Sequence, residues 1–172
     1  MIIIGIDPGS KGGIAELRVD DNGIPEIYNL TVLTAENLKS RAAFMRTIEP
    51  EHRVFWFVEQ QQQSFKGSNQ TSFRIGYGYG FVIGCLEGCN VTIDSIVHPA
   101  SWTSWYKRNF KWYKNFEGDN KERNKKMAKE LFPNEKFLAT KRSKKPHEGL
   151  TDAALIAYYV SQLDTIKNIY QN

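Results

Sequence analysis

The sequence has few cysteines and no long hydrophobic run. Its 172 residues include two cysteines, Cys85 and Cys89, which are too few for a disulfide scaffold or a four-ligand zinc site. No apolar stretch approaches the roughly 20 residues that span a bilayer, and no basic segment precedes an apolar one at the N-terminus. We therefore expect a cytoplasmic protein of one domain, residues 1–172, with no membrane contact.

Basic residues are concentrated in one part of the chain. Residues 98–147 hold 14 of the 23 Lys and Arg but 5 of the 19 Asp and Glu. A block of this kind favours a polyanionic partner. The alternative is a solvated lysine-rich surface, and charge alone does not decide between the two.

Apolar runs predict a mixed β-sheet. Strands are predicted at residues 2–7, 12–19, 26–33, 53–60 and 90–97. The first and fourth are almost wholly apolar, as expected of central strands that are covered on both faces. The Asn22-Gly23 step favours a hairpin between the second and third strands. Three antiparallel strands therefore open the sheet.

Helical patterns fill the rest of the chain. Helices are predicted at residues 35–48, 71–88, 119–132 and from about Leu150 onwards, with Thr34 and Asp119 as N-caps. Four glycines, Gly76, Gly80, Gly84 and Gly88, repeat along one side of the second helix, so we expect another backbone or helix to approach there. The elements predict an α/β fold with a mixed five-stranded sheet, three antiparallel strands then parallel strands, flanked by helices on both faces.

Four carboxylates are predicted to meet at one edge of this sheet. Asp7 and Glu59 end the two buried strands, and parallel neighbours would bring them together. Glu148 and Asp152 are four residues apart, which places both on one face of a helix start. Such anions repel one another unless cations compensate them. Oxygen-only ligands favour Mg²⁺, with Mn²⁺ as a substitute, over zinc.

Two such ions can cleave a phosphodiester bond by activating water and stabilising the leaving oxygen. The turn "PGSKGG" after Asp7 keeps bulky side chains away from the ions and a phosphate backbone, and Lys11 can contact a phosphate. Taken singly, Asp7 could be a turn residue, and the acids at 148 and 152 could complement a helix dipole. Their occurrence together, in this order, favours a nuclease.

The chain resembles the RuvC family of Holliday junction resolvases, within the ribonuclease H-like superfamily. Four stretches carry the resemblance: "GIDPGSKGGIA", "VEQ" at 58–60, the glycine-rich helix ending in "IGCLEG", and "HEGLTDAALIAYY" at 147–159. The compact chain looks more like phage or viral members than the cellular enzyme, which implies the cytoplasm of a bacterium or of an infected host cell.

The resemblance implies a crossover junction endodeoxyribonuclease. A homodimer would make paired symmetric nicks across a four-way DNA junction, with two ions per site and no small-molecule cofactor. Asp7, Glu59 and Asp152 match the metal-binding carboxylates. Many members place the fourth ligand at the position of Gly149 and others at that of Glu148. We take Glu148 as the fourth catalytic carboxylate and keep His147 as an alternative ligand or phosphate contact.

DNA contacts are expected at three places: beside the carboxylates, in the aromatic and basic segment 101–116, and in the basic loop "KRSKK". Trp102, Trp105 and Tyr106 are assigned to the core instead. After "VEQ" the chain has glutamines where members often have a residue that enters the junction, so Phe65 or Phe73 is expected to substitute. The predicted DNA-binding residues are Lys11, Gln60, Gln62, Phe65, Lys66, Phe73, Arg74, Lys111, Trp112, Tyr113, Lys114, Lys141, Arg142, Lys144, Lys145 and His147.

Three other functions remain open at this point. An actin-like or sugar-kinase phosphotransferase would explain "GIDPGSKGGIA", but the chain is short for two lobes and has no second phosphate motif. A non-catalytic DNA-binding module would explain the basic block but not the four filled acidic positions. A related nuclease that acts on other branched DNA would use the same residues.

Overall fold

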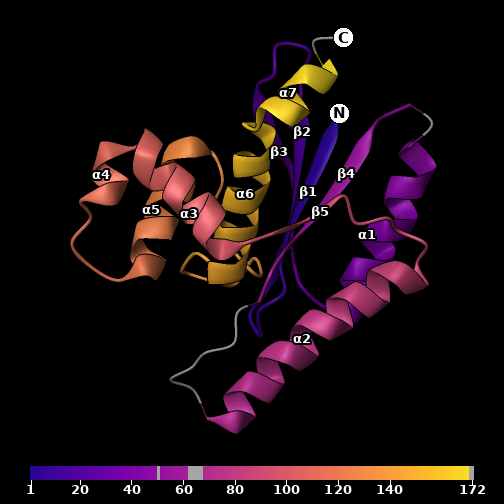
Figure 1. The fold of residues 1–172 in the computed structure, drawn as a ribbon, viewed down its shortest axis with the longest axis horizontal. Coiled ribbons are helices and arrows are strands. Elements are labelled where there is room, and N and C mark those ends of the chain that lie inside the picture. The colour runs from indigo at the N-terminus through magenta and orange to yellow at the C-terminus, as the bar shows by residue number, and fades with distance from the viewer. Residues whose placement is uncertain (50, 62–67, 171–172) are drawn as a thin grey trace.

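The computed structural model describes residues 1–49, 51–61 and 68–170 of the chain. A five-stranded sheet in the order β3-β2-β1-β4-β5 runs through its centre (Figure 1). β1 to β3 pair antiparallel, whereas β4 pairs parallel with both β1 and β5, as the sequence predicts. The strands are β1 (Ile2–Asp7), β2 (Gly13–Val19), β3 (Pro25–Val32), β4 (Val54–Glu59) and β5 (Ser95–Val97).

Helices cover both faces of the sheet (Figure 1). They are α1 (Ala35–Ile48), α2 (Asn69–Gly88), α3 (Pro99–Asn109), α4 (Lys111–Lys114), α5 (Asn120–Leu131), α6 (Glu148–Ser161) and α7 (Asp164–Tyr170). One face packs against α6, with α3, α4 and α5 beyond it, and the other packs against α1 and α2. The predicted coverage of both faces is confirmed. None of the helices in the described ranges is long and apolar enough to cross a bilayer.

Local signals fix several helix ends. The side chain of Thr34 accepts a hydrogen bond from the backbone N–H of Asn37, so α1 begins where the sequence predicts. Asp119 caps α5 in the same way, accepting from the N–H of Lys121. Near Asn22-Gly23, Gly23 adopts a φ of 77°, which suits the predicted turn between β2 and β3.

The strand predicted at 90–97 is shorter in the structure. β5 comprises Ser95–Val97, and residues 90–94 form no strand. Asn90 adopts a positive φ of 56° after α2, and the N–H of Val91 bonds back to the carbonyl of Leu86. The carboxylate of Asp94 then accepts from the N–H of Trp56 at 2.7 Å. A side chain thus takes the place of a backbone ladder bond, which delays the start of the strand.

Glycines allow α6 to lie unusually close to the sheet. A Cβ atom on Gly5 of β1 would lie 2.5 Å from the carbonyl oxygen of Ala153, and one on Gly149 would overlap the carbonyl oxygen of Lys11. Real Cβ atoms do not approach backbone oxygens that closely. The first turns of α6 are therefore held directly against the end of β1.

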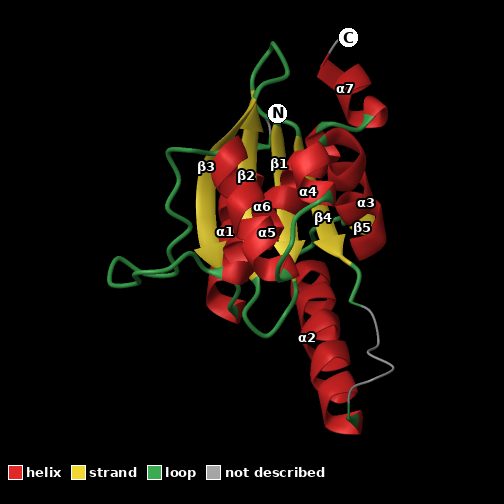
Figure 2. Ribbon diagram, turned by 90° about the vertical axis from the view of Figure 1, so that its left-hand side faces the viewer, coloured by secondary structure: helices red, strands yellow, loops and turns green. Residues whose placement is uncertain are grey.

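The opposite helix, α2, extends well beyond the sheet (Figure 2). Val82 and Leu86, in its C-terminal half, are buried against the sheet. The glycine side is open: a Cβ atom at Gly76, Gly80, Gly84 or Gly88 would meet no atom within 4 Å. The expected approach of another backbone to these glycines does not occur within the described part of the chain.

Candidate active site

The four predicted carboxylates come together at one edge of the sheet. Asp7 is the last residue of β1 and Glu59 the last of β4, and these strands are parallel neighbours with Ile6 opposite Val58. Glu148 begins α6, and Asp152 lies one turn further along. The charges of Asp152, Glu59 and Glu148 all act on Asp7. The predicted convergence is therefore present.

Asp7 is the most strongly perturbed of the four. Burial, followed by the charges of Asp152 and Glu59, raises the pKa of Asp7 to about 8. One oxygen, Oδ1, accepts a hydrogen bond from the backbone N–H of Gly9 at 2.9 Å. This bond fixes the side chain within the turn that follows β1.

Glu59 is held from the helical layer. Burial raises its pKa to about 7, the hydrogen bond from Trp102 opposes that shift, and the charge of Asp152 adds to it. The indole Nε1–H of Trp102 donates to Oε1 of Glu59 at 2.8 Å in a buried contact. Gln61 makes a longer contact, 3.3 Å, to the other oxygen. Trp102 thus belongs to the core, as predicted, and also positions a site residue, which was not predicted.

Asp152 is the third carboxylate with a raised pKa. Burial raises its pKa to about 6, and a hydrogen bond from Asn124 partly offsets that shift. Nδ2 of Asn124 donates to Oδ1 of Asp152 at 2.9 Å. The hydroxyl of Tyr113 donates to Oδ1 of Asn124 at 2.7 Å. Two uncharged side chains therefore connect the helical layer to this carboxylate.

Glu148 differs from the other three because lysines from α5 neutralise it. Lys121 lies 2.8 Å from one of its oxygens and Lys125 lies 3.4 Å from the other. The hydrogen bond from Lys121 is the main reason that the pKa of Glu148 is lowered. Because only glycine fits at position 149, the fourth acidic side chain stands four residues before Asp152 rather than three.

The donor set suits a hard divalent ion, although the site is not preformed for one. In the described ranges, no group of three or more His, Cys, Asp or Glu side chains is arranged to hold a metal ion as it stands. Three neighbouring carboxyl groups with raised pKa values nevertheless form an oxygen-only donor set of the kind that hard divalent ions prefer. Each of the three has one oxygen fixed by an N–H donor.

Most of the predicted DNA contacts that the structure describes lie on the surface. Those with exposed side chains are Lys11, Gln60, Phe73, Arg74, Lys111, Lys114, Lys141, Arg142, Lys144 and Lys145. His147 is half-buried, and its Nδ1 has no hydrogen-bond partner. Gln62, Phe65 and Lys66 lie outside the described residues. A cavity of about 240 Å³ separates the turn after β1 from the start of α2, with Arg74 and Gln61 among its lining residues.

The prediction that Tyr113 contacts DNA from the surface is wrong. Its side chain is fully buried, and the guanidinium of Arg123 covers its ring at 4.3 Å. Trp112 is half-buried, its ring is covered by the ammonium of Lys126 at 4.6 Å, and its Nε1–H donates to Glu130. The segment packs inwards because α4 folds back onto the helical layer. The aromatic residues of this alternating pattern therefore lie in the core or against it rather than on the open surface.

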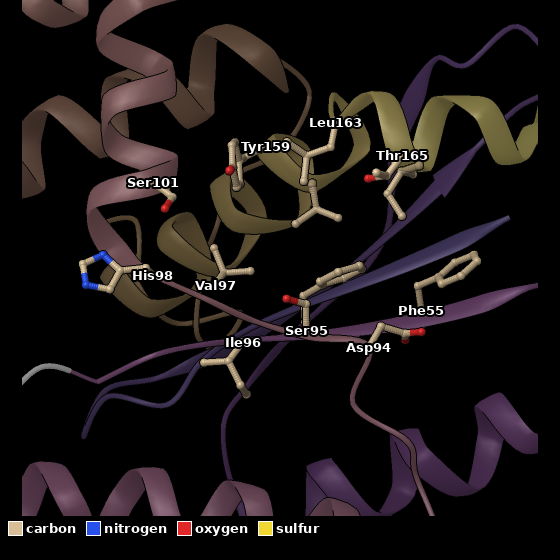
Figure 3. Close-up of a pocket in the computed structure, with 13 residues that line it drawn as sticks. Phe55, Asp94, Ser95, Ile96, Val97, His98, Ser101, Tyr159, Leu163 and Thr165 are labelled. Carbon is tan, nitrogen blue, oxygen red and sulfur yellow. The ribbon is translucent and has the colours of Figure 1, made fainter.

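A second cavity lies away from the carboxylates. It measures about 390 Å³ and lies between β5, the start of α3, and the end of α6 with α7 (Figure 3). Figure 3 shows His98 and Asp94 at different parts of its lining. None of the predicted site residues lines it. The carboxylate edge, rather than this cavity, is therefore the candidate active site.

Comparison with solved structures identifies the fold. The chain matches "T. thermophilus RuvC in complex with Holliday junction substrate" with a TM-score of 0.55 and 18% identity over 92% of each chain. It matches "Thermus thermophilus RuvC structure" with a TM-score of 0.53 and 19% identity, again over 92% of each chain. The chain has the ribonuclease H-like fold of RuvC. No protein-family model and no curated protein matches it.

Proposed function

We propose that this protein is a metal-dependent DNA endonuclease that resolves four-way junctions by paired, symmetric nicks. One observation carries the proposal: Asp7, Glu59 and Asp152 lie close enough at one edge of a RuvC-type sheet for their charges to raise one another's pKa values. A buried cluster of three acids destabilises the fold unless it binds cations. Cleavage of a phosphodiester bond is the chemistry that such a cluster best supports.

The residues that would hold two Mg²⁺ ions, or Mn²⁺ in their place, are these three carboxylates and Glu148, with His147 as the alternative fourth ligand. When bound, the ions supply an activated water and charge stabilisation for the leaving oxygen. The protein contributes orientation. An N–H hydrogen bond holds one oxygen of each of the three carboxylates: Oδ1 of Asp7, Oε1 of Glu59 and Oδ1 of Asp152.

Basic groups near this edge favour a DNA backbone as the substrate. Lys121 and Lys125 already lie beside Glu148, so two ammonium groups are placed next to the carboxylates. Lys11 is exposed in the turn after β1, and Arg74 lines the cavity between that turn and α2. Phosphates on either side of a scissile bond could pair with these cations.

We further propose a homodimer that forms through α2. The open glycine side is one to which another helix could pack closely. Phe73 and Tyr77 are exposed on the same helix, at 72% and 67%, and stack on each other. A symmetric pair of copies would present two carboxylate edges to a symmetric junction. A monomer at micromolar concentration in sedimentation experiments would contradict this arrangement.

The decisive experiment uses a labelled four-way junction and a linear duplex of the same sequence. Wild-type protein with Mg²⁺ should nick the junction at symmetric positions and leave the duplex intact. Asp7→Asn and Asp152→Asn should each lower the cleavage rate by about 10²-fold or more, since each removes a charged ligand. Asp164→Asn, an exposed acid on α7, is the matched control and should cleave normally.

The other outcomes are equally informative. Cleavage of flaps or forks in preference to four-way junctions would favour a nuclease for other branched DNA. Tight junction binding without cleavage under any divalent ion would favour a non-catalytic binding module. ATP turnover that is lost in Asp7→Asn would indicate a phosphotransferase instead.

A further inference from the structure

Asn124 is an unusual residue for its position in the fold. It lies on the inner face of α5 with 7% of its surface exposed, in line with the apolar Met127 and Ala128. A buried amide needs partners for both its N–H and its carbonyl oxygen. Here the two partners are Tyr113 and Asp152.

The hydrogen-bond chemistry of this chain of three residues allows a single direction. An ionised carboxylate can only accept, so the amide must turn its Nδ2 towards Asp152. Its Oδ1 then faces Tyr113, whose hydroxyl donates at 2.7 Å. The Tyr113 ring is in turn fixed between the core and the guanidinium of Arg123. A rigid aromatic side chain thus determines the orientation of the amide.

We propose that Tyr113 and Asn124 are positioning residues for the metal site, fixing Oδ1 of Asp152 so that its Oδ2 is presented to a divalent ion. This inference rests on the proposed function. Neither residue would touch the ion or the DNA. Their role is to prevent Asp152 from rotating away from its negative neighbours, Asp7 and Glu59, before an ion binds.

Tyr106 provides a matched control for the loss of a buried hydroxyl. It is fully buried like Tyr113, and its hydroxyl donates to the carbonyl oxygen of Leu155 at 2.9 Å. Both tyrosines contact each other with ring centroids 5.4 Å apart. Tyr106→Phe therefore removes a comparable hydrogen bond from the same cluster, but one that does not belong to the hydrogen-bonded chain ending at Asp152.

The test measures Mn²⁺ binding to the full-length protein without DNA, by electron paramagnetic resonance. Asn124→Leu, which keeps the branched shape but removes both hydrogen bonds, should weaken Mn²⁺ binding about 10-fold or more. Tyr113→Phe should weaken it about threefold, because the amide loses one of its two anchors. Tyr106→Phe should bind Mn²⁺ like the wild type. Thermal unfolding in EDTA shows how much each variant is destabilised.

The outcomes separate this inference from the function beneath it. If wild-type protein binds Mn²⁺ and Asp152→Asn does not, the site exists. Unchanged binding in Asn124→Leu and Tyr113→Phe would then overturn the positioning role alone. Equal weakening in Tyr106→Phe and Tyr113→Phe would also overturn it, because the effect would follow from packing. Absence of Mn²⁺ binding in the wild type would overturn both proposals.

Discussion

Two regions of this molecule carry aromatic side chains, which are exposed in one region and buried in the other. On α2, Phe73 and Tyr77 project into solvent and stack with ring centroids 6.3 Å apart. In the layer formed by α3, α4 and α5, Tyr106 and Tyr113 are fully buried and surrounded by other rings. The same class of residue is a surface feature in one region and part of the core in the other.

The difference depends on what lies opposite each helix. The α3–α5 layer packs on α6, which is apolar on nearly every side, so aromatic rings fill the space between them. The N-terminal half of α2 extends beyond the sheet (Figure 2), where Gly78 lies beside the backbone of the turn after β1 and the rings of Phe73 and Tyr77 stay exposed. One region is therefore suited to fixing the carboxylates, and the other to contacting a separate molecule.

Alanine substitutions should give the largest difference in the free energy of unfolding between the two regions. Tyr106→Ala removes a fully buried ring and its hydrogen bond to Leu155, so we expect a loss of roughly 3–5 kcal/mol in the free energy of unfolding. Phe73→Ala should change that free energy by no more than about 0.5 kcal/mol, because the ring is exposed. Urea unfolding followed by circular dichroism measures both.

The same pair also tests function. If Phe73 enters the junction or contacts a partner, Phe73→Ala should weaken junction cleavage while leaving stability unchanged. A marked loss of stability in Phe73→Ala would mean that α2 packs against something in solution even without DNA. That result would remove the contrast between the two regions.

The second prediction concerns the carboxylate edge and the dependence of stability on pH. Asp7, Glu59 and Asp152 have raised pKa values in the folded state, about 8, 7 and 6. The folded protein therefore binds more protons than the unfolded chain between about pH 4 and pH 8. The stability that these three groups contribute is fully present below about pH 4 and is lost as the pH rises through their folded-state pKa values.

In EDTA, we expect the free energy of unfolding of the wild-type protein to fall by about 2–3 kcal/mol between pH 5 and pH 8. This fall is smaller than the separate pKa shifts would give, because a proton on one carboxyl group also removes its repulsion of two neighbouring carboxylates. Asp7→Asn should lose much less, and Mg²⁺ should stabilise the wild type at pH 8 but not this variant. Glu87→Gln, an exposed acid on α2, is the control and should follow the wild type. Identical pH profiles for wild type and Asp7→Asn would refute the predicted crowding of charges.

Much of the fold and the four carboxylates could be predicted from the sequence. Two apolar runs that each end in an acid describe parallel central strands, and the structure places Asp7 and Glu59 accordingly. The cap at Thr34 likewise fixes the start of α1. Each strand with its terminal acid, and the helix cap, is recognised from residues close together in the chain, so local patterns are sufficient to predict them.

The partners of the carboxylates could not be predicted in the same way. Trp102 reaches Glu59 across 43 positions of sequence and Asn124 reaches Asp152 across 28, and no local pattern encodes those pairings. One signal was present for Asn124, since a polar residue on the apolar face of a predicted helix requires a buried partner. The prediction for Tyr113 is wrong because alternating aromatic and basic residues occur in two settings. They occur on DNA-binding surfaces, and they also occur at the edge of a core where cationic side chains cover the aromatic rings.

Glycine-to-alanine substitution should have effects of opposite sign on stability at a packed glycine of β1 and at an open glycine of α2. Gly5→Ala should destabilise the protein by roughly 1–3 kcal/mol, because the new Cβ atom would meet the backbone of α6. Gly80→Ala should stabilise it by up to about 1 kcal/mol, since alanine favours a helix and the space there is open. Thermal unfolding at low protein concentration measures both.

Repeating the Gly80→Ala measurement at high concentration then tests the dimer: if a second α2 packs on the glycine side, the gain in stability should shrink or reverse as copies associate. A gain that is independent of concentration would leave that surface without a partner copy.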